Sequence, residues 1–265
     1  MKKIIKLYDK SKIEKTLRRN ICLNIYGIGD LDDFFFINTE WYAVSQGDEI
    51  LETAYLYRGT DLPVLLAMCG EENGNMKILL KGIMNEFPEK IYAHLTEGLE
   101  KVFDYDYKRT DHGKHFKMCL YKNDFTEENS GENIRRLLPG DIGIIKEFYN
   151  TAYPDNWFDG RMLGTGKYFG MFSENGLIGV AGIHVYSAEY KTAALGNITT
   201  HPLHRGKSIC RKVTSALCSD LFKTTDIIGL NVLCENKAAI ECYQRLGFRI
   251  CGEYSEYSFT KKLSV

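Results

Sequence analysis

The sequence predicts an α+β protein with a mixed, mostly antiparallel sheet flanked by helices and a second, smaller α/β domain of similar element order. Apolar segments of strand length alternate with amphipathic helical segments along the 265 residues. A polar, acidic segment, residues 123–133, interrupts this alternation. The elements follow a similar order on both sides of it. We therefore predict two domains, residues 1–124 and 133–265.

The composition is that of a soluble globular protein, with 44% hydrophobic and 26% charged residues. A net charge of −1 creates no field that would attract nucleic acid or an anionic membrane. The basic N-terminus lacks the apolar core of a signal peptide, and no apolar run approaches the ~18 residues of a membrane span. We expect a cytoplasmic protein that binds neither nucleic acid nor membrane.

The eight cysteines include no CxxC pair, and a chain of this length can build a core without disulfides. Five of them lie in periodic apolar segments: Cys210, Cys218, Cys234, Cys242 and Cys251. We predict reduced, mostly buried thiols. A zinc site is the alternative, but no tight ligand cluster supports it, so no metal is expected.

The first half begins with a helix whose apolar residues recur every fourth position, as amphipathic helices require. Strand-like, β-branched or aromatic runs and helical runs then alternate. In order, the predicted elements are a helix through Ile13, Leu17 and Ile21, strands Phe34–Val44, Ile50–Tyr57 and Pro63–Cys69, a helix Asn75–Phe87, a strand Lys90–Leu95, a helix Glu97–Phe103 and a strand His115–Tyr121.

The second half repeats much of this order. Pro139 and Asp141 suit a helix start, Asn175-Gly176 is typical of a hairpin turn, and Gly247 suits a helix end. The predicted elements are a strand Ile134–Leu138, a helix to about Tyr149, strands Lys167–Ser173, Ile178–Val185 and Thr192–Thr200, a helix Ser208–Phe222, a strand Ile227–Val232, a helix Lys237–Leu246 and a hairpin of Phe248–Glu253 with Ser258–Leu263.

A short loop of Arg205, Gly206 and Lys207 joins the strand ending at Thr200 to a long helix. The first turn of a helix leaves N–H groups without internal partners and carries the positive end of the helix dipole. A small-residue loop lets a diphosphate approach these donors, and the two cations add attraction. The loop could thus hold a diphosphate without a metal. An ordinary strand–turn–helix that binds nothing is the alternative.

The segment after the next strand strengthens the diphosphate interpretation, because the two segments together resemble the GNAT superfamily of N-acetyltransferases. Two ordered motifs carry the resemblance: Pro202, Arg205 and Gly206, then Asn236, Ala239, Tyr243, Gly247 and Phe248. It covers the chain from Ile134 to its end. The first half has no such loop and is similar to the degenerate, half-GNAT domain of one subgroup.

The resemblance implies that the protein uses acetyl-CoA and releases CoA. The strand before the loop would pair with the pantetheine arm, and backbone N–H groups of the loop would hold the pyrophosphate. The implied cofactor-binding residues are Ile198, Thr199, Thr200, Arg205, Gly206, Lys207, Ser208, Ile209, Cys210, Asn236 and Tyr243. Two of them depart from the family pattern, since Ser208 replaces a glycine and Cys210 replaces a smaller residue.

The implied chemistry is attack of a neutral amine on the thioester, so a base must remove the amine proton. The strand Thr192–Thr200 has no Asp or Glu, and His184 on the preceding strand is the best substitute. Tyr243 matches the family tyrosine that protonates the leaving thiolate. The alternatives are an ordinary strand histidine and a tyrosine that packs a helix face.

We expect an N-acyltransferase whose partner is a small-molecule amine rather than a protein. A homodimer is compatible with this function. The rival from another class is a non-catalytic acyl-CoA-binding sensor or regulatory module. The missing strand carboxylate and Ser208 favour that rival. A nucleotide-binding protein fits less well, because neither a P-loop nor a dinucleotide-binding glycine pattern is present.

Overall fold

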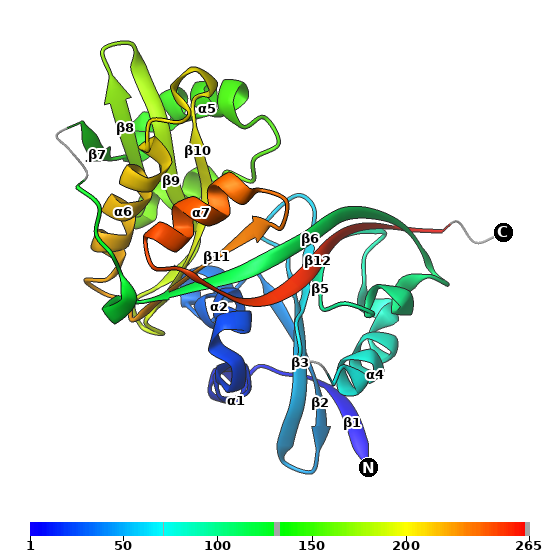
Figure 1. The fold of residues 1–265 in the computed structure, drawn as a ribbon. Helices are drawn as coiled ribbons and strands as arrows, with labels where there is room; N and C mark the ends of the chain where they lie inside the picture. Colours follow the sequence, from blue (N-terminus) through cyan, green and yellow to red (C-terminus); the bar gives the residue numbers. More distant parts are fainter. Residues whose placement is uncertain (71, 130–132, 263–265) are drawn as a thin grey trace. The chain divides into compact units, whose positions relative to one another are not determined.

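A computed structural model of the chain describes residues 1–70, 72–129 and 133–262 (Figure 1). They form two compact units. Unit 1 contains Met1–Lys117, Leu233–Glu235 and the chain from Cys251 onward. Unit 2 contains Met118–Val232 and Asn236–Ile250.

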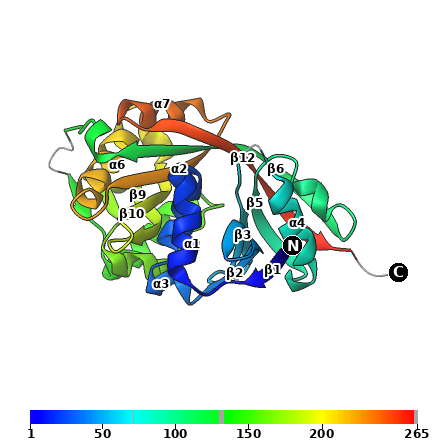
Figure 2. The same ribbon diagram turned by 90° about the horizontal axis from the view of Figure 1, so that it is seen from below.

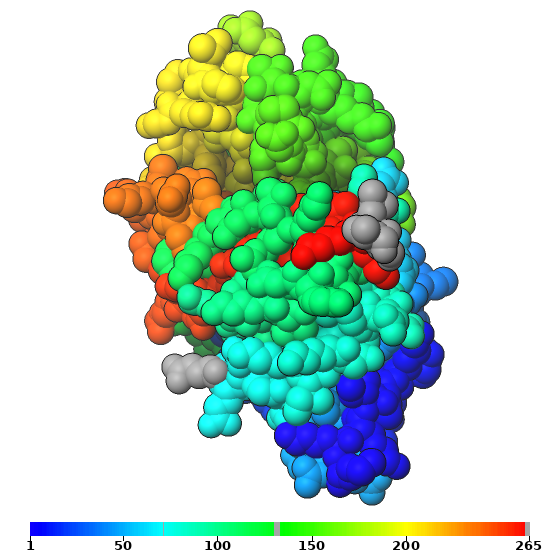
Figure 3. Space-filling model, turned by 90° about the vertical axis from the view of Figure 1, so that its right-hand side faces the viewer, coloured from blue at the N-terminus to red at the C-terminus, as the bar shows by residue number. Residues whose placement is uncertain are grey.

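The units differ from the two continuous segments that the sequence predicts, because the last strand belongs with the first part of the chain. Strand β12, Arg249–Lys261, pairs antiparallel with β5, Lys90–Leu95, from Ser255↔Leu95 to Thr260↔Lys90. In Figure 3 the red residues near the C-terminus lie among the green and teal residues of unit 1. The predicted C-terminal hairpin is therefore wrong: one long strand replaces it.

Unit 1 has the strand order β1-β2-β3-β4-β5-β12-β6, with β4 and β5 parallel. Helices α1 and α2 cover one face of this sheet and α4 the other (Figures 1 and 2). The remaining bounds are β1 Lys2–Lys6, α1 Lys10–Leu17, α2 Ile21–Gly29, α3 Asp33–Phe36, β2 Thr39–Gln46, β3 Glu49–Tyr57, β4 Val64–Ala67, α4 Gly74–Gly82, a 3₁₀ helix Glu100–Phe103 and β6 Tyr107–Tyr121, which passes into unit 2 after Lys117.

Two departures from the predicted elements of unit 1 have local causes. The predicted strand Phe34–Val44 begins as helix α3, because the Asp32 carboxylate accepts a hydrogen bond from the Phe34 N–H and caps that turn. Strand β1 is exposed along its whole length and carries three lysines, so it lacks the buried alternation from which strands are recognised.

Unit 2 has the strand order β7-β8-β9-β10-β11-β6, in which β10 and β11 are parallel. The predicted Asn175-Gly176 hairpin is confirmed by the β8–β9 pairing, with φ = +110° at Gly176. The bounds are β7 Ile134–Arg136, α5 Ile142–Ala152, a 3₁₀ helix Gly160–Thr165, β8 Phe169–Ser173, β9 Gly176–Ser187, β10 Thr192–Thr200, α6 Ile209–Leu221, β11 Ile227–Leu233 and α7 Lys237–Arg245.

The predicted linker packs against unit 2 over part of its length. The Thr126 N–H donates to the Leu246 carbonyl at 3.1 Å, and the Glu128 N–H donates to the Ser215 hydroxyl at 2.9 Å. Residues 130–132 of the linker and 263–265 at the chain end lie outside the described residues.

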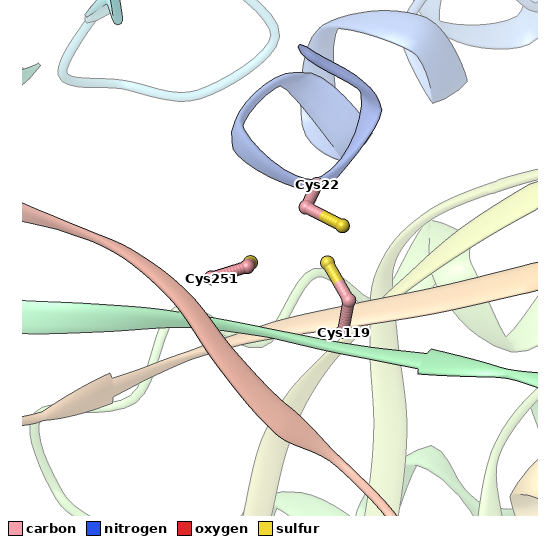
Figure 4. Close-up of side chains that lie close together, drawn as sticks. All are labelled: Cys22, Cys119 and Cys251. Atoms are coloured by element: carbon pink, nitrogen blue, oxygen red, sulfur yellow. The ribbon is translucent and has the colours of Figure 1, made fainter. Parts of the chain in front are cut away.

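All eight cysteines are free thiols in the structure, and the prediction that they are mostly buried is wrong. Cys69, Cys119 and Cys218 are buried, Cys251 is exposed, and the other four are partly exposed. In unit 1, Cys22 of α2 and Cys251 of β12 bring their sulfur atoms within 4.8 Å (Figure 4). These two thiols would supply half of a tetrahedral zinc shell.

No helix within the described ranges is both long enough and apolar enough to cross a lipid bilayer.

Candidate functional site

Strands β10 and β11 diverge in unit 2, and this opening is the centre of the candidate site. They pair in parallel only from Thr192↔Ile227 to Ala194↔Gly229. Beyond Ala194, β10 continues for six residues to Thr200 and stays paired with β9 on its other side. The β11-facing edge of this part of β10 therefore presents backbone N–H and C=O groups that an extended ligand could pair with.

Each diverging strand also carries a buried side-chain oxygen with no hydrogen-bond partner among the described residues. These atoms are Oγ1 of Thr200 on β10 and Oδ1 of Asn231 on β11. Buried polar atoms nearly always have partners in folded proteins. A polar ligand in the opening is one way to supply them.

A β-bulge distorts β10 inside the opening. The register with β9 shifts between Gly196 and Thr199, and Asn197 takes a left-handed conformation with φ = +54°. Bulges of this kind redirect neighbouring backbone groups and are frequent beside active sites. The strand was predicted with its correct bounds, but its pattern of residues did not indicate the bulge.

Three hydrogen bonds hold Asn197, which is 6% exposed. The Tyr149 hydroxyl donates to its carbonyl at 2.6 Å, its amide nitrogen donates to the Tyr168 hydroxyl at 3.2 Å, and its amide oxygen accepts from the Trp157 N–H at 3.2 Å. Burial raises the pKa of Tyr149 and of Tyr168, so both hydroxyls stay protonated. The Asn197 side chain thus helps to fix the bulge.

His184 of β9 lies against the bulge. A Cβ atom added to Gly196 would stand 2.1 Å from Cδ2 of His184, so only glycine lets the imidazole lie over β10 there. The His184 side chain is partly exposed. The structure therefore places the candidate base over the bulge of β10.

The loop before α6 alternates extended and left-handed backbone. Arg205 is extended, while Gly206 and Ser208 have φ of +78° and +59°. Left-handed residues turn successive N–H groups toward a common point, which creates an anion-binding concavity. Ser208 replaces the family glycine at a position with left-handed backbone, the conformation that glycine adopts at least cost.

The charges around this loop are uncommitted. Arg205 and Lys207 are exposed, and neither forms an ion pair with any residue that the structure describes. No atom lies within 4 Å of a Cβ placed on Gly206, so the space above the loop is open. This combination fits a diphosphate: two cations, converging N–H donors and room for a ligand.

The start of α6 is held firmly. Ile209 occupies the space beside Gly179 of β9, where a Cβ would lie 2.4 Å from its Cγ2 atom. Further along, burial opposes ionisation of Asp220, but hydrogen bonds and charges from Arg136 and Lys167 outweigh it and hold the pKa of this carboxyl at about 2. These contacts fix the position of α6 and therefore of the loop that precedes it.

Helix α7 carries the second motif. The Asn236 side chain accepts a hydrogen bond from the Ala239 N–H at 3.2 Å and caps the helix. Tyr243 is 7% exposed, and its ring packs edge-on against Phe248 at 5.9 Å. Gly247 ends the helix with φ = +99°, beside the carbonyl of Asp124.

The structure gathers the predicted residues on neighbouring elements of unit 2: the edge of β10, the loop, the first turn of α6, and α7. Sequence reasoning missed the three aromatic residues that fix the bulge, Tyr149, Trp157 and Tyr168. Tyr149 ends a predicted helix, Trp157 lies in the segment after it, and Tyr168 lies in the predicted strand Lys167–Ser173. Nothing in their spacing indicates contact with β10.

Known proteins resemble this chain in the sequence of its second half and in its fold. Residues 132–248 match the model of the acetyltransferase (GNAT) family. A search of curated proteins found no significant match. Three solved structures have the same fold along nearly the whole chain, each at 11 or 12% sequence identity.

The first is a Drosophila protein, with a TM-score of 0.74, 11% identity, and coverage of 97% of this chain and 98% of that one. A GCN5-related N-acetyltransferase from Sphaerobacter thermophilus has a TM-score of 0.62 and 12% identity, with 98% and 95% covered. A tandem GNAT protein from the clavulanic acid biosynthesis pathway has a TM-score of 0.59 and 11% identity, with both chains fully covered.

Proposed function

We propose that this chain, a GNAT-superfamily protein with two GNAT-like domains, is an N-acyltransferase that moves an acetyl or other acyl group from acyl-CoA to a primary amine. One observation carries the proposal: β10 leaves β11 after Ala194 and ends at Thr200, and a single 3₁₀ turn, Pro202–His204, leads from it into the left-handed loop at the start of α6. An exposed strand edge followed by an anion-binding loop matches a molecule with an amide-containing arm and a diphosphate.

The residues of unit 2 fit acyl-CoA in these two parts. Ile198, Thr199 and Thr200 offer the open edge of β10 to the pantetheine amides. N–H groups from Gly206 to Cys210 hold the diphosphate, and the side chains of Arg205 and Lys207 add charge. When bound, acyl-CoA supplies the activated thioester.

Two side chains are proposed to move protons. His184, over Gly196 beside the bulge, takes the proton of the attacking amine. Tyr243 donates a proton to the departing sulfur. A thiolate is weakly basic, so the loss of this donor slows turnover without abolishing it.

The acceptor is proposed to be a small amine in the cytoplasm. The segment before the 3₁₀ helix Gly160–Thr165 contacts the bulge, since the Trp157 N–H donates to the Asn197 amide oxygen, and Trp157 is 41% exposed. An exposed indole beside a polar bulge suits the apolar part of a small amine, and its face attracts cations. A homodimer is compatible with this arrangement.

A non-catalytic acyl-CoA-binding module is the second candidate, because β10 carries no carboxylate and Ser208 occupies a glycine position. Incubation with acetyl-CoA and a panel of primary amines, with release of the CoA thiol as the readout, separates the two functions. An enzyme releases thiol only when a matching amine is present. Saturable binding without release for any amine would favour the binding module, and the absence of both would refute the shared acyl-CoA site.

A further inference from the structure

Two thiols of unit 2 meet where α6 begins. Cys210, in the first turn of α6, and Cys242, on α7 next to Tyr243, have their Sγ atoms 3.4 Å apart. The two helices lie side by side (Figures 1 and 2). The cysteine that replaces a smaller residue of the family motif thus directs its sulfur at a second cysteine. Nothing in acyl transfer requires this pair.

The pair is chemically unequal. The Cys242 S–H donates to the sulfur of Cys210, and this bond lowers the pKa of Cys210, while burial opposes it. The same bond, together with burial, raises the pKa of Cys242. Cys210 is therefore the better nucleophile, since thiolates and not thiols attack disulfides.

Accessibility and charge also favour reaction at this pair. Both side chains are partly exposed, so a small oxidant can reach them. The charges of Arg211 and Arg245 favour a thiolate at Cys242. Cys218, two turns further along α6, is the contrast: it is fully buried, and burial raises its pKa.

We propose that Cys210 and Cys242 form an oxidation site that reacts with small-molecule disulfides and ties α6 to α7 through a reversible disulfide bond. The Cys210 thiolate attacks one sulfur of the oxidant, forming a mixed disulfide and releasing one thiol. Cys242 then loses its proton and attacks the Cys210 sulfur, which releases the second thiol. Two protein thiols are oxidised, and one small disulfide is reduced to two thiols.

The effect on acyl-CoA rests on the proposed function. A disulfide needs an S–S separation of about 2.05 Å and fixed torsions, so the sulfur atoms must approach each other by more than an ångström. Cys210 lies in the turn whose N–H groups are assigned to the diphosphate. Because hydrogen bonds weaken steeply with misalignment, we expect oxidation to lower acetyl-CoA affinity about tenfold.

The full chain, reduced and folded, is incubated in glutathione buffers of increasing oxidised fraction, alkylated and mapped by mass spectrometry. The expected product is a peptide that joins Cys210 to Cys242. Cys242→Ser should accumulate glutathione on Cys210, because the resolving thiol is missing. Cys234→Ser, at a partly exposed cysteine in unit 1, is the matched control and should form the link normally.

Failure of the native protein to form the Cys210–Cys242 link, with circular dichroism showing a folded chain, would overturn the proposal. Glutathione trapped on neither cysteine in Cys242→Ser would overturn the assignment of Cys210 as nucleophile. Neither readout depends on acyl-CoA.

The regulatory consequence is measured by calorimetry with acetyl-CoA on the reduced protein, the oxidised protein and the protein reduced again with dithiothreitol. Weakening on oxidation and recovery on reduction are expected. Equal affinity in both states would refute the coupling to the site. Absence of binding to the reduced protein would refute the proposed function while leaving the oxidation site standing.

Discussion

Replacing Gly206 by glutamate tests the anion-binding loop most sharply. The space above Gly206 is open, so the longer side chain meets no protein atom at its Cβ. The φ of +78° makes any other residue cost on the order of 1 kcal/mol in folding stability. The variant should therefore fold, with a carboxylate where the diphosphate is expected.

The loss of affinity follows from Coulomb's law. A carboxylate about 6 Å from one diphosphate charge, at an effective dielectric constant of about 20, costs about 3 kcal/mol. This corresponds to roughly a hundredfold weaker acetyl-CoA binding. Gly206→Gln is the matched control, because it has the same size and the same backbone strain without the charge.

The assay is calorimetric titration of both variants and the native protein at low and high salt. The difference between Gly206→Glu and Gly206→Gln should shrink at high salt, because mobile ions screen an exposed charge. Equal affinity for the two variants at low salt, close to that of the native protein, would refute the placement of the diphosphate at this loop.

Three further outcomes follow. His184→Gln, which keeps a side chain of similar size, should lower kcat about a hundredfold and leave the Kd of acetyl-CoA unchanged; an unchanged kcat would remove its role as base. Tyr243→Phe should lower kcat about tenfold, measured by thiol release, while a large loss of thermal stability without a rate effect would show a packing role instead. The Asp220 carboxylate has a folded-state pKa of about 2, below its unfolded value, so it contributes about 2 kcal/mol of stability above pH 4 that disappears as the pH falls toward 2. Asp220→Asn should lose that contribution in urea unfolding at pH 7, whereas the exposed control Asp226→Asn should not; equal losses would contradict the Asp220 network.

Periodic apolar segments were predictable because their local pattern and their burial agree. The bounds of Thr192–Thr200 and Lys90–Leu95 were correct for this reason. The loop and the Asn175-Gly176 turn were predictable because turn chemistry depends on a few neighbouring residues. These local features covered most of the elements that carry the site.

The features that the sequence did not predict depend on contacts between distant segments. Strand β12 pairs with β5, which lies about 160 residues earlier in the chain, and no local pattern encodes that partner. The left-handed Asn197 depends on Tyr149 and Tyr168 from other elements. The meeting of Cys210 with Cys242 likewise requires that two helices pack together.

Hydrogen exchange with and without acetyl-CoA tests the central claim most directly, because it reports on individual backbone N–H groups. The account predicts that acetyl-CoA slows exchange in two segments of unit 2: the open edge of β10 at Ile198–Thr200, and the loop with the first turn of α6 at residues 205–210. The same ligand should leave the β2–β3 strand pair of unit 1 unaffected, since no residue of that pair is assigned a contact with it. Exchange unchanged in both segments at saturating acetyl-CoA, or protection confined to unit 1, would contradict the site.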